Sequence, residues 1–352
     1  MIQEIRIKNY LSFRDEAVLS FEATKDTTFE ECQVVNVTPK VRLLRFALIY
    51  GANGSGKSNL LNAMDFLCGF WFDKKSDIDE ETGVLPFLLD TETPNEPSEF
   101  NIKFFVDDKR YWYTLVLNDK QVIKENLYVY NSVQPSLVFS RELDGTASLI
   151  KLNASLVKAN ATIVEQLNVK CLSNMSFFAA RNQVNCSLAY IDEVRDWMKN
   201  NMMPIIEPGT RMFEYAGKQM EKNAELKAYI LDFVHKADYN ITDVYTEREK
   251  VPIPDFVKTS IMEDKDIPEK TKEKMLADNA IERLRTDFQH TVKNKRGEEN
   301  YRLPNSLQSE GTKRTFGIEA AIYEAIKTNG ILPIDEIESS LHPELVEFII
   351  EK

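Results

Sequence analysis

Cysteine and histidine are scarce in this chain of 352 residues, which contains four cysteines and three histidines. No cysteines form a Cys-x-x-Cys pair and each histidine stands alone, so the sequence indicates neither a disulfide framework nor a zinc site. No apolar run approaches the roughly 18 residues that a membrane-spanning helix needs. The opening MIQEIRIKNY alternates as a strand does, unlike a signal peptide. These absences predict a cytoplasmic protein without a membrane partner.

An excess of positive charge is also absent, because 44 basic residues stand against 56 acidic ones and the net charge is -12. This balance excludes a uniformly basic nucleic-acid surface but not a local basic strip. The hydrophobic share of 43% is ordinary for a globular protein with a sizeable core. The length predicts two domains, or one large domain with an insertion.

Glycine is scarce as well, with 12 residues, yet three glycines fall within six positions at Gly51, Gly54 and Gly56. They belong to GANGSGKS, which matches the pattern G-x-x-x-x-G-K-[ST]. The apolar run LLRFALIY at 43–50 precedes it and is typical of a buried parallel strand. The residues after it show the apolar spacing of an amphipathic helix. A strand and a helix on either side are the context that indicates a phosphate-binding loop.

The chemistry of such a loop assigns a role to each type of residue. Its glycines let backbone N–H groups converge on phosphate oxygens, and the following helix N-terminus favours negative charge. Lys57 is expected to reach the β- and γ-phosphates, and the Ser58 hydroxyl to bind Mg²⁺. The residues predicted to hold the nucleotide here are Gly51, Asn53, Gly54, Ser55, Gly56, Lys57, Ser58 and Asn59.

Two carboxylates, Asp335 and Glu336, end the apolar run ILPIDE, which predicts a second buried strand. Asp335 is positioned to hold Mg²⁺, and Glu336 to orient or deprotonate the attacking water; the alternative is a solvated strand end. Pro333 is unusual inside a strand because it removes a ladder hydrogen bond. No Asn-Lys-x-Asp motif for guanine occurs, so the sequence favours ATP over GTP.

A second anion site is indicated at Ser309 and Gly311 in LQSEGT, where a helix begins that ends near Asn329-Gly330. The alternative is that Ser309 only caps the helix. Lys313 and Arg314 follow, either to neutralise phosphate charge or to face solvent.

Between these motifs, turn signals at Asp107-Asp108, Asn118-Asp119 and Asp144-Gly145 predict an antiparallel meander. The chain then becomes more charged, and 155–290 is predicted to be mostly helical. The fold class is therefore α/β, a P-loop sheet with a meander and an inserted helical lobe.

The order of these motifs resembles the ABC-type ATPase head of the superclass that holds SMC, RecF and OLD proteins. More closely, it resembles the AbiL/RloA-like "AAA family" ATPases of bacterial phage-defence operons. The segments that carry the resemblance are IRIKNYLSF, GANGSGKSN, FNIKFFVDDKRYWY, LQSEGTKR and IDEIESSLHPEL. The resemblance implies a discontinuous ATP-binding core at 1–154 and 301–352 with a helical insertion at 155–300.

The resemblance also implies how the site is assembled. Ser309 and Gly311 match the ABC signature, which contacts the γ-phosphate of ATP on the opposite subunit, so two ATP molecules would be sandwiched in a dimer or larger assembly. Gln183 in FFAARNQVN resembles the glutamine that touches Mg²⁺ and the attacking water, although a plain helix- or strand-end glutamine fits equally well. Glu336 matches the catalytic base, and Ser340–Pro343 the D-loop.

Three functions follow as alternatives. The first is an ATPase whose ATP-dependent dimerisation gates a separate effector, a nuclease or toxin, in anti-phage defence. The second is a repair or clamp-type ATPase that binds DNA directly, with Lys293, Lys295 and Arg296 as a basic tip; the alternative for these three residues is a solvated hairpin, which is the more common use of such a charge run. The third is a switch that binds ATP without hydrolysing it. Such heads continue to a switch histidine, so we expect the natural chain to extend past residue 352.

Overall fold

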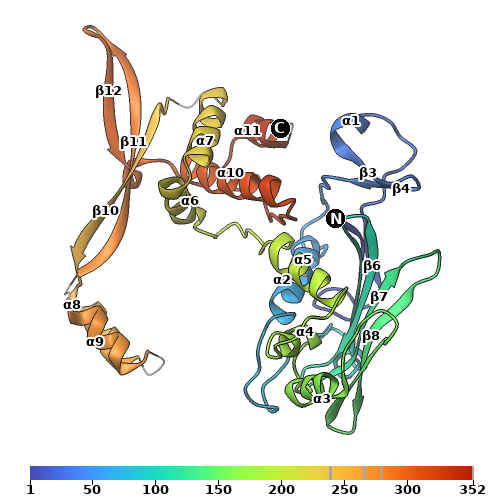
Figure 1. The fold of residues 1–352 in the computed structure, drawn as a ribbon. Coiled ribbons are helices and arrows are strands. Elements are labelled where there is room, and N and C mark those ends of the chain that lie inside the picture. The colour runs from blue at the N-terminus through green and yellow to red at the C-terminus, as the bar shows by residue number, and fades with distance from the viewer. Residues whose placement is uncertain (238–239, 265–266, 278–279, 351–352) are drawn as a thin grey trace. The chain divides into compact units, whose positions relative to one another are not determined.

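The computed structural model describes residues 1–237, 240–264, 267–277 and 280–350. The chain divides into two compact units, both discontinuous in sequence (Figure 1). The first unit comprises 1–206 with 328–335, and the second comprises 207–327 with 336–352. The boundary in the C-terminal part therefore falls between Asp335 and Glu336.

The first unit is built on a seven-stranded antiparallel sheet. Its strands are β1 (Ile2–Lys8), β2 (Ala17–Ser20), β5 (Ser98–Val106), β6 (Lys109–Leu117), β7 (Val122–Tyr130), β8 (Ser136–Asp144) and β9 (Ala147–Leu152). Their order is β2-β1-β5-β6-β7-β8-β9. The predicted turns at Asp107-Asp108, Asn118-Asp119 and Asp144-Gly145 each lie between two paired strands, so the meander is confirmed.

Helices line one face of this sheet (Figure 1). They are α2 (Lys57–Phe70), α3 (Ala161–Lys170), α4 (Phe177–Arg181) and α5 (Ile191–Asn201). The predicted amphipathic helix after the glycines is α2, which buries Met64 and Leu67 in the core. Trp197 of α5 stacks on Phe104 of β5 with ring centroids 4.3 Å apart. The core of the unit therefore lies between the helices and the sheet.

The predicted buried strand at 43–50 is wrong over most of its length. The structure has β3 (Val34–Thr38) paired with β4 (Val41–Leu44), after a short helix α1 (Glu30–Gln33), and no strand at 45–50. Leu48 is 59% exposed and Tyr50 88% exposed. An apolar run becomes a strand only where another strand takes up its N–H and C=O groups. Within the described ranges, no ladder pairs with 45–50.

The predicted strand at ILPIDE is present only as two parallel bridges, Met202 with Ile331 and Ile206 with Ile334. The register between them shifts by one residue. Pro333 lies at this shift, and its carbonyl accepts a hydrogen bond from the N–H of Ile206 at 3.0 Å. Because proline has no N–H to continue the ladder, the pairing is interrupted here. Pro333 thus limits this segment to two short contacts.

The second unit combines helices with a three-stranded sheet of order β10-β11-β12. Its elements are α6 (Met212–Lys222), α7 (Ala224–Lys236), β10 (Asp243–Pro252), α8 (Asp255–Glu263), α9 (Glu269–Ala277), β11 (Ala280–Asn294), β12 (Gly297–Pro304), α10 (Glu310–Thr328) and α11 (Pro343–Ile350), with one-turn helices η2 (Asn305–Leu307) here and η1 (Thr93–Asn95) in the first unit. The prediction of mostly helix over 155–290 is wrong at β10 and β11. These strands are rich in charge, so their sequence lacks the alternating apolar signal of a half-buried strand.

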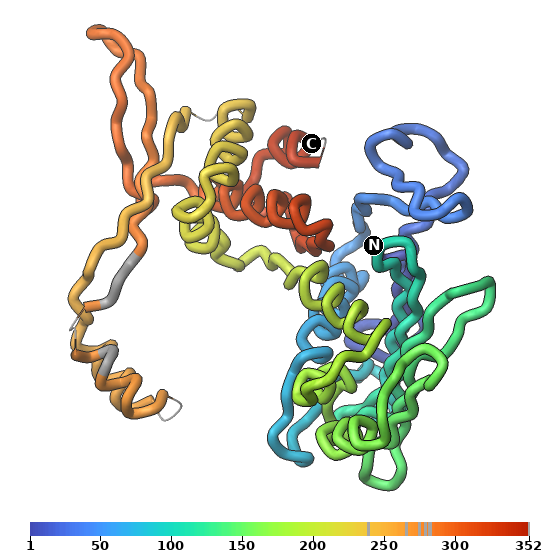
Figure 2. Tube along the Cα trace, viewed as in Figure 1, coloured from blue at the N-terminus to red at the C-terminus, as the bar shows by residue number. Residues whose placement is uncertain are grey.

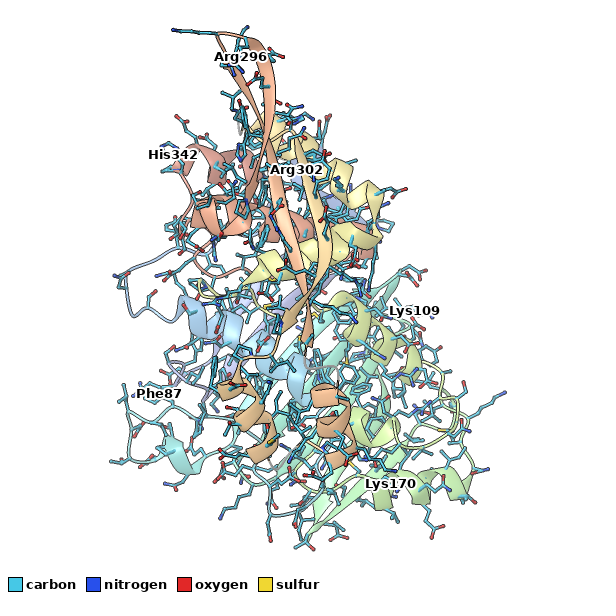
Figure 3. All side chains as sticks on the ribbon, turned by 90° about the vertical axis from the view of Figure 1, so that its left-hand side faces the viewer. Phe87, Lys109, Lys170, Arg296, Arg302 and His342 are labelled. Atoms are coloured by element: carbon cyan, nitrogen blue, oxygen red, sulfur yellow. The ribbon has the colours of Figure 1, made fainter. Side chains whose placement is uncertain are left out.

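The strands of the second unit form a long ribbon, with α8 and α9 at one end and the turn between β11 and β12 at the other (Figure 2). Asn294 pairs with Gly297, so Lys295 and Arg296 form a two-residue turn, and Figure 3 shows Arg296 at the outer end of the ribbon. Where the ribbon meets the helices of its unit, Phe288 of β11 packs against Phe213 of α6 and Phe316 of α10. The ribbon is therefore anchored in the helical core of its unit.

Both units mix helices with antiparallel strands, so the predicted α/β fold class is confirmed. No helix in the part of the chain that the structure describes has the length and apolar character to cross a membrane.

Candidate nucleotide-binding site

The glycine-rich segment forms an exposed loop that leads directly into α2. Gly54 and Gly56 have φ values of 78° and 93°, in the left-handed region where a side chain is strained. A Cβ on Gly56 would lie 2.7 Å from the Ser12 hydroxyl oxygen and 3.3 Å from Phe13. Glycine is therefore required at position 56 by both backbone conformation and space. The turn that holds Ser12 and Phe13 was not predicted as part of the site.

Lys57, the first residue of α2, folds back over the loop. Its ammonium donates hydrogen bonds to the carbonyls of Gly51 at 2.8 Å and Ala52 at 3.1 Å. The first turn of α2 contains no acidic residue, so its free N–H groups and dipole act together with the lysine charge. This end of α2 is electropositive and fits an anion such as a phosphate.

The remaining residues predicted to bind the nucleotide also lie in the loop or in the first turn of α2. Ser58 is exposed in the first turn of α2, and Asn53 and Ser55 are exposed in the loop. Asn59 is half-buried and its side-chain oxygen accepts a hydrogen bond from Asn62 at 3.4 Å. The Ser58 hydroxyl lies beside the free N–H groups at the start of α2. A hydroxyl in this position fits the coordination of Mg²⁺. No cluster of three or more His, Cys, Asp or Glu residues within the described ranges has metal-binding geometry.

Asp335 is connected to α2 within the first unit by two hydrogen bonds through the 205–206 segment. Its N–H donates to the carbonyl of Ile206 at 2.9 Å. The neighbouring Ile205 N–H donates to the Asp65 carboxylate on α2 at 3.2 Å. The 202–206 segment therefore links the helix of the phosphate loop to the segment that ends in Asp335.

Gln183 lies in a loop whose carbonyls accept hydrogen bonds from the buried side chain of Arg181. Arg181, at the end of α4, donates to the carbonyls of Val184 at 2.8 Å and Cys186 at 2.6 Å, and pairs with Asp192. Gln183 is half-buried, and its own N–H donates to the carbonyl of Ala180. Its position is fixed by the loop, while its role stays a prediction.

Ser309 caps α10 in the structure, which is one of the two interpretations of this residue from the sequence. Its hydroxyl oxygen accepts a hydrogen bond from the N–H of Thr312 at 3.1 Å. A Cβ on Gly311 would lie 2.6 Å from the carbonyl oxygen of Ser340, so the start of α10 approaches the chain after Glu336 closely. Lys313 pairs with Glu310 at 2.8 Å. These contacts leave the predicted signature role of Ser309 and Gly311 untested.

Arg314 is half-buried, and it makes backbone contacts within the second unit that its sequence does not predict. Its guanidinium donates to the carbonyls of Pro208 at 2.9 Å and Glu336 at 3.0 Å. Glu336 itself adopts φ 45°. Burial lowers the pKa of Arg314, and the negative charges of Glu336 and Glu338 oppose that shift.

Residues 46–151 and 214–351 match the model of the family described as "AAA domain, putative AbiEii toxin, Type IV TA system". These ranges cover more than half of the chain. The chain belongs to this family. The matched ranges include the phosphate loop, the Ser309 segment and both Asp335 and Glu336, whereas Gln183 lies outside them. No curated protein matches the chain.

Membership of this AAA family makes the chain a P-loop ATPase domain of the AAA/ABC-like superclass, of a kind associated with Abi and toxin–antitoxin systems. Nucleotide binding is the property that the family implies, and the exposed loop, the two glycines with positive φ and Lys57 fit that property.

Proposed function

We propose that this AAA domain binds and hydrolyses ATP, and that ATP-dependent dimerisation of the chain gates a separate effector in anti-phage defence. The observation that carries the proposal is the phosphate loop, where Lys57 holds the carbonyls of Gly51 and Ala52 at the electropositive start of α2. A phosphate that binds here replaces those carbonyls as the acceptor for the lysine.

The proposed roles follow from the chemistry of each group. Lys57 and the loop N–H groups bind the β- and γ-phosphates. Ser58 and Asp335 hold Mg²⁺, with Gln183 as an additional ligand; when bound, the ion neutralises charge that develops on the phosphates. Glu336 orients the attacking water and accepts its proton.

Dimerisation rests on the resemblance of LQSEGT to an ABC signature. Ser309 and Gly311 would contact ATP that is bound to the partner, so closure would need two nucleotides. The effector, a nuclease or toxin on another polypeptide, is proposed from the resemblance to the AbiL/RloA-like ATPases and agrees with the toxin–antitoxin association of the family.

The test is the solution mass of Glu336→Gln with and without Mg-ATP. Removal of the general base slows hydrolysis by roughly 10²- to 10⁴-fold, while the substitution keeps the size and shape of the side chain. Bound ATP should then persist, and we expect the mass to double from 40.6 kDa only when Mg-ATP is present.

Glu336→Gln combined with Lys57→Ala is the control, and its mass should not respond to ATP. A mass that Mg-ATP leaves unchanged in Glu336→Gln would contradict ATP-driven dimerisation. Turnover that persists at the native rate in Glu336→Gln would contradict the role of Glu336.

Direct DNA binding is a second candidate, favoured by the tip of the ribbon. Lys293, Lys295 and Arg296 are all exposed there, in a chain whose net charge is -12. If this tip binds phosphate groups, DNA should stimulate turnover, and replacing the three residues by glutamine should abolish that stimulation. Each lost contact should also lower the salt dependence of binding by about 0.9 in log–log slope.

A variant that neutralises the exposed Lys120, Lys124 and Lys151 of the first unit changes the net charge equally and is the matched control. Stimulation by DNA that both variants lose alike would indicate a general charge effect and contradict a site at the tip.

A further inference from the structure

Three segments of the second unit meet at one guanidinium. Arg314 is on α10, five residues after Ser309, and its two terminal nitrogens donate to carbonyls from different parts of the chain. One is Pro208, before α6, at 2.9 Å, and the other is Glu336 at 3.0 Å. Because a guanidinium is planar and rigid, it fixes the spacing and direction of both carbonyls at once.

The carbonyl that Arg314 binds belongs to a residue in an unusual conformation. Glu336 has φ 45°, which is sparsely populated by non-glycine residues and persists only where neighbours enforce it. Its carbonyl accepts a second hydrogen bond from the N–H of Ser339 at 2.9 Å. Two donors therefore fix the peptide group after Glu336, and this peptide group helps to set where the Glu336 side chain can point.

A second contact joins the same two segments. The carbonyl oxygen of Ser340 lies only 2.6 Å from the position that a Cβ on Gly311 would take, and Ser340 also has a positive φ of 63°. The first turn of α10 therefore touches the 336–340 loop near its end, while Arg314 binds the beginning of that loop. A shift of this end of α10 must move the loop as well.

We infer that Arg314 is a positioning residue that holds the backbone of Glu336, so that the carboxylate is aligned for water activation and follows the start of α10. The inference rests on the proposed role of Glu336 as general base. It adds a residue that acts through Glu336, and it gives a physical route by which nucleotide contact at Ser309 would reach the base of the same chain.

The experiment compares steady-state ATP hydrolysis of the full chain with Arg314→Lys, Arg314→Gln and the control Arg285→Gln. Arg285 is an exposed arginine of the same unit, paired with Asp287. We expect both Arg314 variants to lower kcat by about 10- to 100-fold, the range found when a supporting residue of a catalytic centre is removed. KM and the Kd of a fluorescent ATP analogue should change less than about 2-fold. Lysine should restore little, because an ammonium has no planar fork.

The decisive measurement repeats Arg314→Gln in the Glu336→Gln background. A residue that acts only through Glu336 has no further effect once the base is gone, so the two substitutions should be strongly non-additive. An equal loss of kcat in both backgrounds would overturn the inference, as would native kcat in Arg314→Lys and Arg314→Gln. Should the glutamine variant not fold, Arg314→Lys, which keeps the charge, serves in both backgrounds. Absence of turnover in the unsubstituted protein would instead refute the proposed ATPase function, and the inference with it.

Discussion

Replacing Lys57 by alanine should abolish ATP turnover and weaken ATP binding, with the largest functional effect of any substitution in this chain. A hydrogen bond to a charged group is worth about 1.5–3 kcal/mol, so the affinity for ATP should fall roughly 10- to 150-fold. Loss of one donor that stabilises the transition state lowers kcat by roughly 10²- to 10³-fold more. The measurement is kcat and KM with Mg-ATP, together with equilibrium binding of a fluorescent ATP analogue.

The fold should survive this substitution, because Lys57 is half-exposed and contributes two hydrogen bonds to loop carbonyls. Lys120→Ala removes the same charge from an exposed turn of the first unit and should leave turnover at its native value. Native turnover in Lys57→Ala would contradict the assignment of this loop to ATP, whereas tight ATP binding without turnover in the unsubstituted protein would favour the non-hydrolysing switch.

The features that the sequence predicted well are those that short stretches of chain determine. Gly54, Gly56 and Lys57 lie at fixed spacing between an apolar run and a helix, and local backbone sterics require their loop. The turns at Asp107-Asp108 and Asp144-Gly145 likewise depend on the few residues that form them. The helix after Ser309 begins and ends where its cap and the Asn329-Gly330 stop signal place it.

The features that the sequence did not predict depend on partners that are distant in the chain. Whether 45–50 is a strand depends on a neighbouring strand, which its apolar residues alone cannot specify. β10 was not predicted because its side chains are mostly polar and because it forms a strand through its pairing with β11. Arg314 could be seen as a cation, but its carbonyl acceptors are about 106 and 22 residues away in sequence. No local pattern encodes contacts at such separations.

A buried ion pair in the first unit stabilises the segment that leads to Gln183. Arg141 is 1% exposed and Glu125 is fully buried, and the two approach to 3.2 Å. The same guanidinium donates to the carbonyls of Leu172 at 2.8 Å and Met175 at 2.5 Å. The Glu125 carboxylate accepts hydrogen bonds from the N–H of Phe177, at the start of α4, at 2.8 Å and from the Tyr113 hydroxyl at 2.9 Å.

Burial and the Glu125 charge raise the pKa of Tyr113 well above its usual value, so this hydroxyl remains protonated and donates throughout the physiological range. Removal of the Arg141 guanidinium leaves the Glu125 carboxylate buried without its cationic partner.

Arg141→Met should consequently lower the free energy of unfolding of the first unit by about 3–5 kcal/mol, the effect of breaking a buried ion pair by removing one partner. Urea denaturation followed by tryptophan fluorescence is the measurement. The chain has three tryptophans, Trp71, Trp112 and Trp197, and all of them lie in the first unit, so the signal reports on that unit alone.

Lys124→Met is the matched control, because Lys124 is adjacent to Glu125 on β7 and pairs with Glu142 at 3.7 Å on an exposed face. An exposed pair contributes about 0–1 kcal/mol, so this variant should unfold near the native urea midpoint. Equal midpoints for Arg141→Met and Lys124→Met would contradict the structural role of the buried pair. Since the Arg141 carbonyl acceptors directly precede α4, the Arg141→Met variant should also expose the chain between 172 and 186 to proteolysis before the sheet unfolds.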